Sequence, residues 1–332
     1  MYFGAFFFRM TDPQRVSDSE WMNLSRKARG QKNHILAFYS SALNAITTSS
    51  EFFALPIDDH MVHRGRGVYD TGTVVHGNLY NFIPHAERLI SSAKLAKIPC
   101  DWTVDDLIRL VRATVHAGGS KNCSVRIFIS PGFGNFSISS DDCFGPVLYI
   151  AIFNSGDLFP RDPYTVTSES TVREDEVSVR AERGLKSVNY RANAEMAEIA
   201  KKRGGRLGIW LDLNGCVREG SVNNIAIVVE EQGEPLLITP PFDGVLPGCT
   251  LKHVFGILDH IGIKWAFRNF NVQDMYAAQE AIALGGDTHI FSIGMIDGKI
   301  IGDGTLGQVT KKIIDRIQSE IESGENCVKV FE

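Results

Sequence analysis

The sequence predicts a mixed α/β (α+β) fold in two domains, and three observations lead to this prediction. A chain of 332 residues is longer than a single hydrophobic core usually serves. Both halves contain stretches with the two-residue period of strands and stretches with the helical period. Residues 154–163 (NSGDLFPRDP) have the composition of a linker. We therefore expect a small α/β domain over 1–153, a linker over 154–163 and a second domain over 164–332.

The first half of the sequence contains alternating strand and helix signals. Residues 9–33 are polar without a clear period and predict a surface extension, whereas 34–48 alternate as a strand does. Residues 68–80 predict a hairpin, because a His-Gly-Asn centre favours a tight turn. A capping-box pattern and a Gly-Gly pair delimit the second of two helices expected here. The helices are expected from Pro84 and over 103–118, and two strands at 124–129 and 147–153.

The second half also mixes both element types. Residues 164–172 alternate as a strand, and 207–234 are strand-rich with Asn-Gly and Gln-Gly turn signals. Helical spacing of apolar residues recurs in four stretches, with further strands between them. The expected helices are 193–203, 250–260, 272–284 and 306–322, and the further strands lie near Trp265 and Ile290.

Composition and charge argue against several classes of function. A net charge of −5 without a basic stripe does not suit a nucleic-acid surface. No apolar run reaches the roughly 20 residues that a membrane span needs, and the apolar start 1–8 lacks the basic region of a signal peptide. The six cysteines show no C-x-x-C pair and the nine histidines are dispersed, so no metal site or disulfide framework is indicated. A reducing, cytoplasmic location fits this cysteine pattern.

Lys186 lies in a stretch, residues 184–190 (GLKSVNY), that is unusually apolar for a solvated surface. Burial of an ammonium group is costly, and where a protein arranges it the lysine pKa falls and the neutral amine is able to form a Schiff base. The alternative is a side chain whose stem covers apolar surface while its head stays in water. The stretch alone favours this second interpretation, so the case for chemistry depends on other motifs.

Other motifs have the chemistry of a cofactor site, each beside a simpler interpretation. Glu219 precedes a buried strand and is either a partner for a pyridinium nitrogen or a surface residue beside a turn. Residues 246–250 (LPGCT) open a helix whose amides and threonine hydroxyl suit a phosphate, or simply cap it. Residues 285–288 (GGDT) bring backbone amides to a ligand or form a tight turn. Arg88 lies opposite the apolar stripe of its helix, so periodicity alone places it in solvent.

Taken together and in order, these motifs resemble the branched-chain/D-amino-acid aminotransferase family, the fold-type IV pyridoxal-phosphate enzymes. The resemblance extends from about residue 56 to about residue 312 and covers most of the chain. Within the family, the run 58–73 is most similar to the D-amino-acid aminotransferases of plants and protists. The matching stretches are 62–70 (VHRGRGVYD), 84–89 (PHAERL), 185–190, 219–224 (EGSVNN), 239–241, 246–250, 302–304 and 307–310.

The resemblance implies a small α/β N-terminal domain and a larger C-terminal domain built on a pseudo-barrel of strands, with pyridoxal 5'-phosphate in the cleft between them. Lys186 is then the catalytic residue, which forms the Schiff base with the cofactor and moves a proton between the substrate Cα and the cofactor C4′. Glu219 is implied to hold the pyridine nitrogen, and Tyr190 to contact the phenolic oxygen. The residues implied at the phosphate are Arg88, Cys249 (through its amide), Thr250, Gly286 and Asp287.

On the substrate side the sequence departs from the family pattern. Bacterial D-amino-acid enzymes hold the substrate carboxylate with an Arg and a His in the loop after the fourth strand, and the corresponding loop 130–142 contains neither. Arg64 or Arg66 is a candidate for the missing charge, since a bidentate arginine suits a carboxylate. At Gly286 relatives carry a threonine that contacts the phosphate. The residues expected to bind substrate are Tyr69, Arg64, Arg66, Phe133, Phe136 and Thr288.

The activity that the resemblance implies is ping-pong transfer of an amino group from a D-amino acid to a 2-oxo acid, such as 2-oxoglutarate or pyruvate. The enzyme is expected to be a homodimer with substrate contacts across its interface. Three alternatives stay open. The pair Asn189-Tyr190 favours a branched-chain L-amino-acid aminotransferase. The missing carboxylate clamp favours an (R)-selective amine transaminase, and an aminodeoxychorismate-type lyase uses the same lysine.

Overall fold

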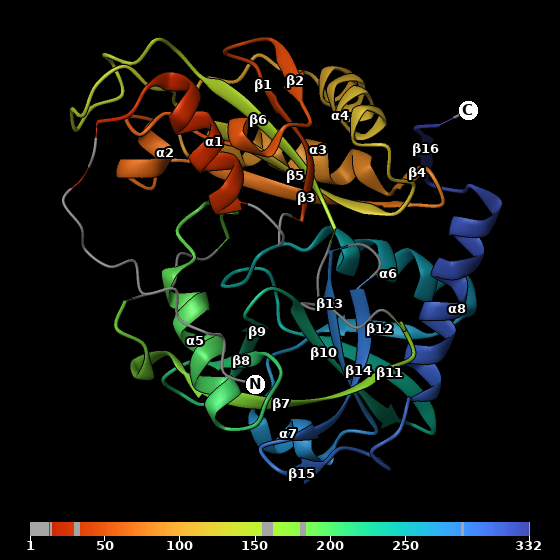
Figure 1. Cartoon of the computed structure of the whole chain (residues 1–332). Coiled ribbons are helices and arrows are strands. Elements are labelled where there is room, and N and C mark those ends of the chain that lie inside the picture. Colours follow the sequence, from red (N-terminus) through yellow and green to blue (C-terminus); the bar gives the residue numbers. More distant parts are fainter. Residues whose placement is uncertain are drawn as a thin grey trace.

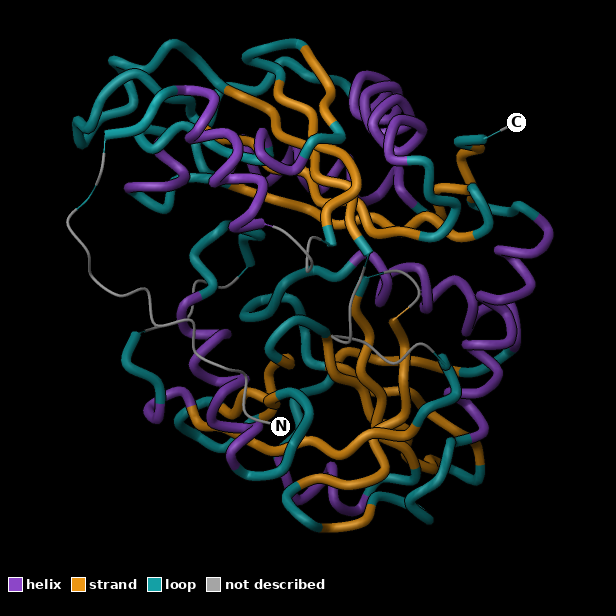
Figure 2. Tube along the Cα trace, in the orientation of Figure 1, coloured by secondary structure: helices purple, strands orange, loops and turns teal. Residues whose placement is uncertain are grey.

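The computed structural model describes residues 13, 15–29, 34–154, 162–179, 184–286 and 289–331. The chain forms two groups of strands, one above the other, each with its own helices (Figure 1, Figure 2). Apart from the last strand, the first sheet contains strands of the N-terminal half and the second sheet those of the C-terminal half. The mixed α/β fold is therefore confirmed. Most of the linker 154–163 lies outside the described residues, and the domain boundary stays a prediction.

The small domain contains an antiparallel sheet covered by two long helices. Its strands are β1 (Ile35–Ser40), β2 (Ala45–Thr47), β3 (Val68–Val75), β4 (Asn78–Tyr80), β5 (Cys123–Ser130), β6 (Val147–Phe153) and the C-terminal β16 (Cys327–Lys329). Its helices are α1 (Asp18–Arg29), η2 (Ser50–Phe52), α2 (His60–His63), α3 (Phe82–Leu95) and α4 (Val104–Gly118). The strand order is β16-β4-β3-β5-β6-β1-β2, and alternate residues of β5, Val125 and Ile127 among them, pack against α3 and α4.

Most elements predicted for this domain are confirmed, including the hairpin 68–80 and the capping box at the start of α4. Residues 34–48, predicted as one strand, instead form the hairpin of β1 and β2, because Asn44 adopts a positive φ of 45° that turns the chain. The extension 9–33 contains α1, whose acidic first turn favours a helix N-terminus. The rest of that extension, residues 9–12, 14 and 30–33, lies outside the described residues.

The large domain contains a curved sheet that closes into a pseudo-barrel. Its strands are β7 (Val166–Arg173), β8 (Gly208–Leu211), β9 (Val217–Gly220), β10 (Asn224–Glu231), β11 (Glu234–Thr239), β12 (Lys264–Phe267), β13 (Glu280–Gly285), β14 (His289–Ile296) and β15 (Lys299–Ile300). Strand β9 pairs with both β8 and β10, so the path β10-β13-β14-β7-β8-β9 returns to β10. This closure agrees with the pseudo-barrel that the resemblance implied.

Alternation along the barrel strands separates two apolar cores. On β10, Ile225 and Ile227 belong to one core, while Ala226 and Val228 pack with the helices α6 (Cys249–Ile261) and α8 (Gln308–Ser323). This packing places α6 at the boundary between the two domains (Figure 1). The remaining elements of the large domain are η3 (Glu174–Glu176), α5 (Arg191–Lys202) and α7 (Val272–Ala277).

The helix predicted over 272–284 is wrong. Helix α7 ends at Ala277, and the following residues form β13, a barrel strand between β10 and β14. The alanines of this stretch fit both a helical and a strand pattern, so periodicity does not separate the two. Burial distinguishes the strand from the helix. Every residue of β13 is buried, as a strand with neighbours on both sides requires.

Helix α8 connects the barrel to the small domain. At its start, the amides of Val309 and Thr310 donate to the carboxylate of Glu280 on β13 at 2.8 and 2.9 Å, which satisfies amides that have no partner within the helix. Beyond its end, β16 pairs with β4. The chain therefore crosses back to the small domain after the barrel is complete.

Glu169 on β7 is a buried carboxyl group in the large domain. It is 4% exposed and accepts a hydrogen bond from the amide of Leu207, while its Oε1 atom has no hydrogen-bond partner among the described residues. Burial raises the pKa of Glu169 to about 7 and outweighs the hydrogen bonds from Leu207 and Thr167. This carboxyl group therefore makes the stability of the fold depend on pH.

We predict that ionisation of Glu169 lowers the free energy of unfolding as the pH rises from 4.5 to about 7. Because the folded-state pKa lies above the unfolded value, stability is highest below this window and lower by about 3 kcal/mol above it. Glu169→Gln keeps the shape without the charge and should remove this slope. Urea unfolding across the window measures it, with the exposed Glu234→Gln as control. An unchanged slope in Glu169→Gln contradicts the prediction.

Candidate active site

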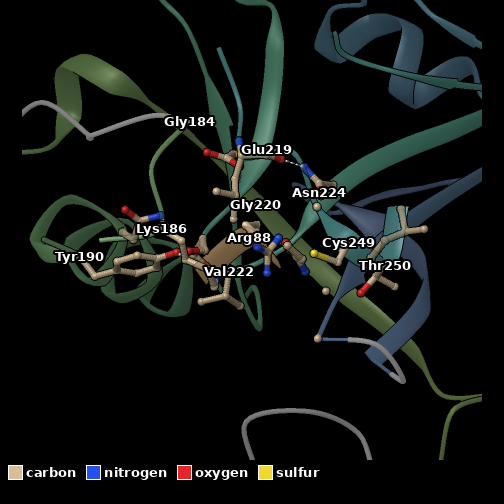
Figure 3. Close-up of a pocket in the computed structure, with 18 of the residues that line it drawn as sticks. Arg88, Gly184, Lys186, Tyr190, Glu219, Gly220, Val222, Asn224, Cys249 and Thr250 are labelled. Carbon is tan, nitrogen blue, oxygen red and sulfur yellow. Dashed lines mark hydrogen bonds between the residues drawn. The ribbon is translucent and has the colours of Figure 1, made fainter. Parts of the chain in front are cut away.

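The stretch that contains Lys186 pairs with the start of β3. The amide of Tyr69 donates to the carbonyl of Lys186 at 3.0 Å, and the amide of Val188 donates to the carbonyl of Gly67 at 3.0 Å. These backbone bonds hold Lys186 between the two domains. In Figure 3, Lys186 and Tyr190 lie on one side of Arg88, and Cys249 and Thr250 lie on the other.

The side chain of Lys186 lines a pocket between the domains. Its Nζ atom lies 3.5 Å from the hydroxyl of Tyr190 and 4.8 Å from the ring centroid of Tyr69. Burial lowers the pKa of Lys186 to about 8, and the positive charge of Arg88 adds to this shift. A lysine with this pKa has an appreciable neutral fraction near neutral pH, which a nucleophile or a base requires.

A buried carboxylate fixes the orientation of Arg88. Asp70 on β3 is 1% exposed and accepts hydrogen bonds from Nε and Nη2 of Arg88 at 2.8 and 2.9 Å, and Nδ1 of His85 lies 2.7 Å from the same carboxylate. Burial alone would raise the pKa of Asp70, but Arg88 and His85 hold it well below its usual range. Nη1 of Arg88 also donates to the carbonyl of Pro247, directly before α6, at 3.3 Å.

The N-terminus of α6 contributes backbone amides to the same pocket. Gly248 is the N-cap, and a Cβ atom there would lie 1.9 Å from Oδ1 of Asn224, so any other residue would displace the Asn224 side chain. Cys249 and Thr250 follow and are buried, and Sγ of Cys249 donates to the carbonyl of Pro84 in α3 at 3.4 Å. A fixed arginine beside the amides of a 13-residue helix makes a site suited to an anion.

Glu219 and Tyr190 complete the pocket around Lys186. Glu219 lies at the end of β9 and accepts a hydrogen bond from the amide of Leu246 through Oε2 at 3.0 Å. Tyr190 is the N-cap residue of α5, and its hydroxyl is hydrogen-bonded to that of Tyr69. Burial raises the pKa of Tyr190, so its phenol stays protonated and able to donate.

A second pocket shares Lys186 and Arg88 with the first and contains an arginine that the sequence analysis missed. Arg126 comes from β5, and its guanidinium carbon lies 5.3 and 5.4 Å from the ring centroids of Tyr69 and Phe153. Its buried Nε has no hydrogen-bond partner among the described residues. A half-buried arginine beside Lys186, with an Nε atom left unpartnered in the described part of the chain, suits an anionic group of a substrate.

A sequence signal for Arg126 does exist. The alternation of β5 directs Val125 and Ile127 into the small-domain core, so the residue between them faces the opposite side of the sheet. His289, at the start of β14, lines the same pocket and was also missed. The histidine and carboxylate around Arg88, His85 and Asp70, lie inside motifs quoted for the resemblance, but no role was assigned to them.

The substrate residues predicted in or beside the loop 130–142, which overlaps the connection 131–146 between β5 and β6, do not line either of these two pockets. Nη2 and Nε of Arg64 donate to the carbonyls of Phe136 and Ser137 at 2.7 and 3.2 Å, and Nη1 of Arg66 donates to the hydroxyl of Ser140 at 2.8 Å. Phe133 packs beside a small cluster of buried residues that includes Tyr149. Tyr69 and Gly286 do line the second pocket, whereas Asp287 and Thr288 lie outside the described residues.

A metal site, a membrane-spanning helix and a disulfide bond are not found in the described part of the chain. Residues 13, 15–29, 34–154, 162–179, 184–286 and 289–331 contain no group of three or more His, Cys, Asp or Glu residues placed to hold a metal ion. None of the helices described there is long and apolar enough to cross a membrane. The six cysteines, all within these ranges, form no disulfide bond with one another.

Comparison with known protein families shows to which family the chain belongs. The family described as amino-transferase class IV matches residues 67–296, which include the strand of Asp70, the lysine stretch and the start of α6. The chain belongs to the class IV aminotransferases. Among relatives of this aminotransferase, the D-amino-acid transaminase, chloroplastic, of Arabidopsis thaliana is 34% identical over 92% of this chain and 81% of that protein. A putative branched-chain-amino-acid aminotransferase of Methanocaldococcus jannaschii is 29% identical over 78% of this chain and 88% of that protein.

Solved structures share the fold of the aminotransferase. The branched-chain amino acid aminotransferase of Thermobaculum terrenum, solved in its PLP form, superposes with a TM-score of 0.76 over 91% of this chain and 100% of that chain. At 19% sequence identity this likeness concerns the fold alone.

The aminotransferase uses pyridoxal 5'-phosphate, as its class does. The residues present fit this group by charge: a lysine with a lowered pKa, a carboxylate at Glu219, and an anion site at Arg88 and α6. A further observation supports the fit. The buried hydroxyl of Ser221 lines the same pocket and has no hydrogen-bond partner among the described residues, which leaves a polar atom for a ligand.

Proposed function

We propose that this aminotransferase moves the amino group of a D-amino acid to a 2-oxo acid by a ping-pong mechanism. The observation that carries the proposal is the position of Arg126, a half-buried cation whose buried Nε has no hydrogen-bond partner among the described residues, in the pocket it shares with Lys186. The 34% identity with the Arabidopsis D-amino-acid transaminase supports the D configuration of the donor.

Lys186 is the proposed catalytic residue. Pyridoxal 5'-phosphate supplies an electron sink, which stabilises negative charge at the Cα atom of the donor. The Nζ atom of Lys186, partly neutral because its pKa is about 8, is the base that takes the proton from that Cα. The hydroxyl of Tyr190 and the ring of Tyr69, at 3.5 and 4.8 Å, keep Nζ inside the pocket.

The cofactor-binding residues are assigned by charge and hydrogen-bonding capacity. Glu219 is the proposed partner of the pyridine nitrogen, and Tyr190 the donor to the phenolic oxygen. Arg88 is assigned to the phosphate because Asp70 holds it beside the start of α6. The other proposed phosphate contacts are the amide of Cys249, Thr250, the amide of Gly286 and, outside the described residues, Asp287.

The substrate carboxylate is assigned to Arg126, with Tyr69 beside it. Both residues line the second pocket, and the guanidinium carbon of Arg126 lies 5.3 Å from the ring centroid of Tyr69. Arg64 and Arg66, the earlier candidates, bond to the loop 131–146 of their own chain. They therefore fit a role at the pocket of a second subunit better than a role at their own.

A homodimer is part of the proposal. Three large apolar side chains of the loop 131–146, Phe136, Ile138 and Phe144, are 59%, 78% and 83% exposed in the single chain. Grouped apolar side chains of this kind are typical of a protein interface. Arg64 is hydrogen-bonded to the same loop. A second copy of the chain that packs on this loop would therefore have Arg64 near the pocket of that second copy.

A branched-chain L-amino-acid aminotransferase is the second candidate function. The similarity to the Methanocaldococcus jannaschii protein favours it, and the same lysine and phosphate site would serve both activities.

The cysteine pattern supports a cytoplasmic location as part of the proposal. Because the Arabidopsis relative is named a chloroplastic enzyme, cell fractionation is the test of location.

We predict that D-alanine converts the holoenzyme from its pyridoxal absorbance to its pyridoxamine absorbance faster than L-leucine or (R)-1-phenylethylamine does. Stopped-flow spectra with each donor alone measure this half-reaction. The Lys186→Ala variant should give no conversion with any donor, since the base is lost. Faster conversion by L-leucine supports the second candidate, and covalent retention of the cofactor by Lys186→Ala overturns the assignment of the lysine.

We predict that Arg126→Met lowers kcat/KM for D-alanine by roughly 10- to 150-fold, the range that corresponds to a lost hydrogen bond to a charged group. Conversion by (R)-1-phenylethylamine, which has no carboxylate, should change less than about threefold. Equal losses for both donors show that Arg126 supports the fold of the pocket instead. Arg112→Met, a substitution of an exposed arginine on α4, is the matched control.

We predict that Arg64 serves the pocket of the partner subunit. As homodimers, Arg64→Ala and Lys186→Ala should each be weakly active or inactive. When the two variants carry different tags and are co-expressed, they form hybrid dimers in which one pocket is intact. The isolated hybrid should then regain about half of the wild-type kcat, because one of two pockets has both residues. A hybrid as inactive as its parents places Arg64 at the pocket of its own chain, and a monomer by light scattering contradicts the dimer.

A further inference from the structure

We propose that Tyr80, Glu320 and His253 form an interdomain clamp that holds α3 and α6 at the distance required to bind the cofactor phosphate. These are positioning residues, because none of them lines either pocket of the described chain. The inference rests on the proposed assignment of the phosphate to Arg88 and the start of α6.

Tyr80 is the residue through which the small domain enters the core of the large domain. It ends β4 and is 0% exposed. Its side chain belongs to the buried cluster of the large domain that contains Val254 of α6 and Ile317 of α8, although its strand belongs to the small-domain sheet. Its position is therefore fixed by packing from both domains.

The hydroxyl of Tyr80 is bound to a buried carboxylate. It donates to Oε2 of Glu320 on α8 at 2.6 Å, and Nε2 of His253 on α6 lies 2.7 Å from the same oxygen. Arg316 adds a positive charge, with Nε 3.3 Å from Oε1 of Glu320. Since Glu320 is 2% exposed, each donor that is removed leaves a buried charge less well compensated.

A backbone connection runs beside these side chains. β16 pairs with β4 so that Cys327 lies opposite Tyr80, and the amide of Asn81 donates to the carbonyl of Asn326 at 2.8 Å. Nδ2 of Asn326 also lies 3.3 Å from Oε2 of Glu320. The end of β4, the end of α8 and the middle of α6 are thus joined at one buried point.

The clamp lies one helical turn from the proposed phosphate site on α6 and directly before α3 on the small-domain side. His253 follows Cys249 by four residues on α6, about 6 Å along the helix axis. Tyr80 precedes α3, whose Pro84 carbonyl accepts from Sγ of Cys249 and whose Arg88 donates to the carbonyl of Pro247. A change in the α3–α6 distance at the clamp would therefore separate Arg88 from the α6 amides.

Binding of two ligands to the apoenzyme tests the clamp: pyridoxal 5'-phosphate and pyridoxal, which lacks the phosphate. Tyr80→Phe and His253→Leu should each raise the Kd for pyridoxal 5'-phosphate about tenfold, the size expected for one lost hydrogen bond to a buried charge. The Kd for pyridoxal should change less than about twofold. His253→Gln keeps a donor for Glu320 and should restore the affinity that His253→Leu loses.

Tyr276→Phe is the matched control, because it also removes a tyrosine–carboxylate bond, from Tyr276 to Asp297 at 2.9 Å, in the large domain. An unchanged Kd for pyridoxal 5'-phosphate in Tyr80→Phe, or equal losses for both ligands, overturns the clamp. The proposed phosphate site is tested separately by wild type and Arg88→Ala. If wild type binds both ligands equally, or Arg88→Ala loses no preference for the phosphorylated one, the phosphate assignment fails instead.

Discussion

The buried pair of Asp70 and Arg88 is the interaction on which the geometry of the site depends. Two hydrogen bonds from one guanidinium to one carboxylate define its orientation, and removing one partner of such a buried pair costs about 3–5 kcal/mol. Both residues come from the small domain, while Lys186, Glu219 and the start of α6 come from the large one. The anion site is therefore assembled between two domains and depends on their relative position.

The charges around Lys186 are arranged to keep its amine partly neutral. Burial, Arg88 and Arg126 lower its pKa, while Asp70 and Glu219 oppose that effect. In the proposed function the two arginines also attract two different anions, the phosphate of the cofactor and the carboxylate of a substrate. Under that proposal, one set of cations supports both the chemistry of the lysine and the binding of its ligands.

The sequence predicted the fold more completely than the substrate side of the site. Ordered motifs predicted Lys186, Glu219 and the start of α6, which line one pocket, because each has a local pattern of glycines, prolines or apolar neighbours. For Arg126 the alternation of β5 predicts only the face of the sheet, and that this face lies beside the lysine stretch follows from tertiary structure. Strand β13 was missed for the same reason, because the conformation of its alanine-rich sequence depends on its neighbours in the barrel.

The return of the chain to its first sheet has a consequence for folding. Tyr80 and Glu320 are 240 residues apart in sequence, and β4 obtains its outer neighbour only when β16 arrives. Contacts this distant in sequence carry a large entropy of loop closure and form late. During synthesis, the small-domain sheet is therefore left with an unpaired edge until the barrel has been made. Completion of the first domain waits for the second, and the two are expected to unfold as one cooperative unit.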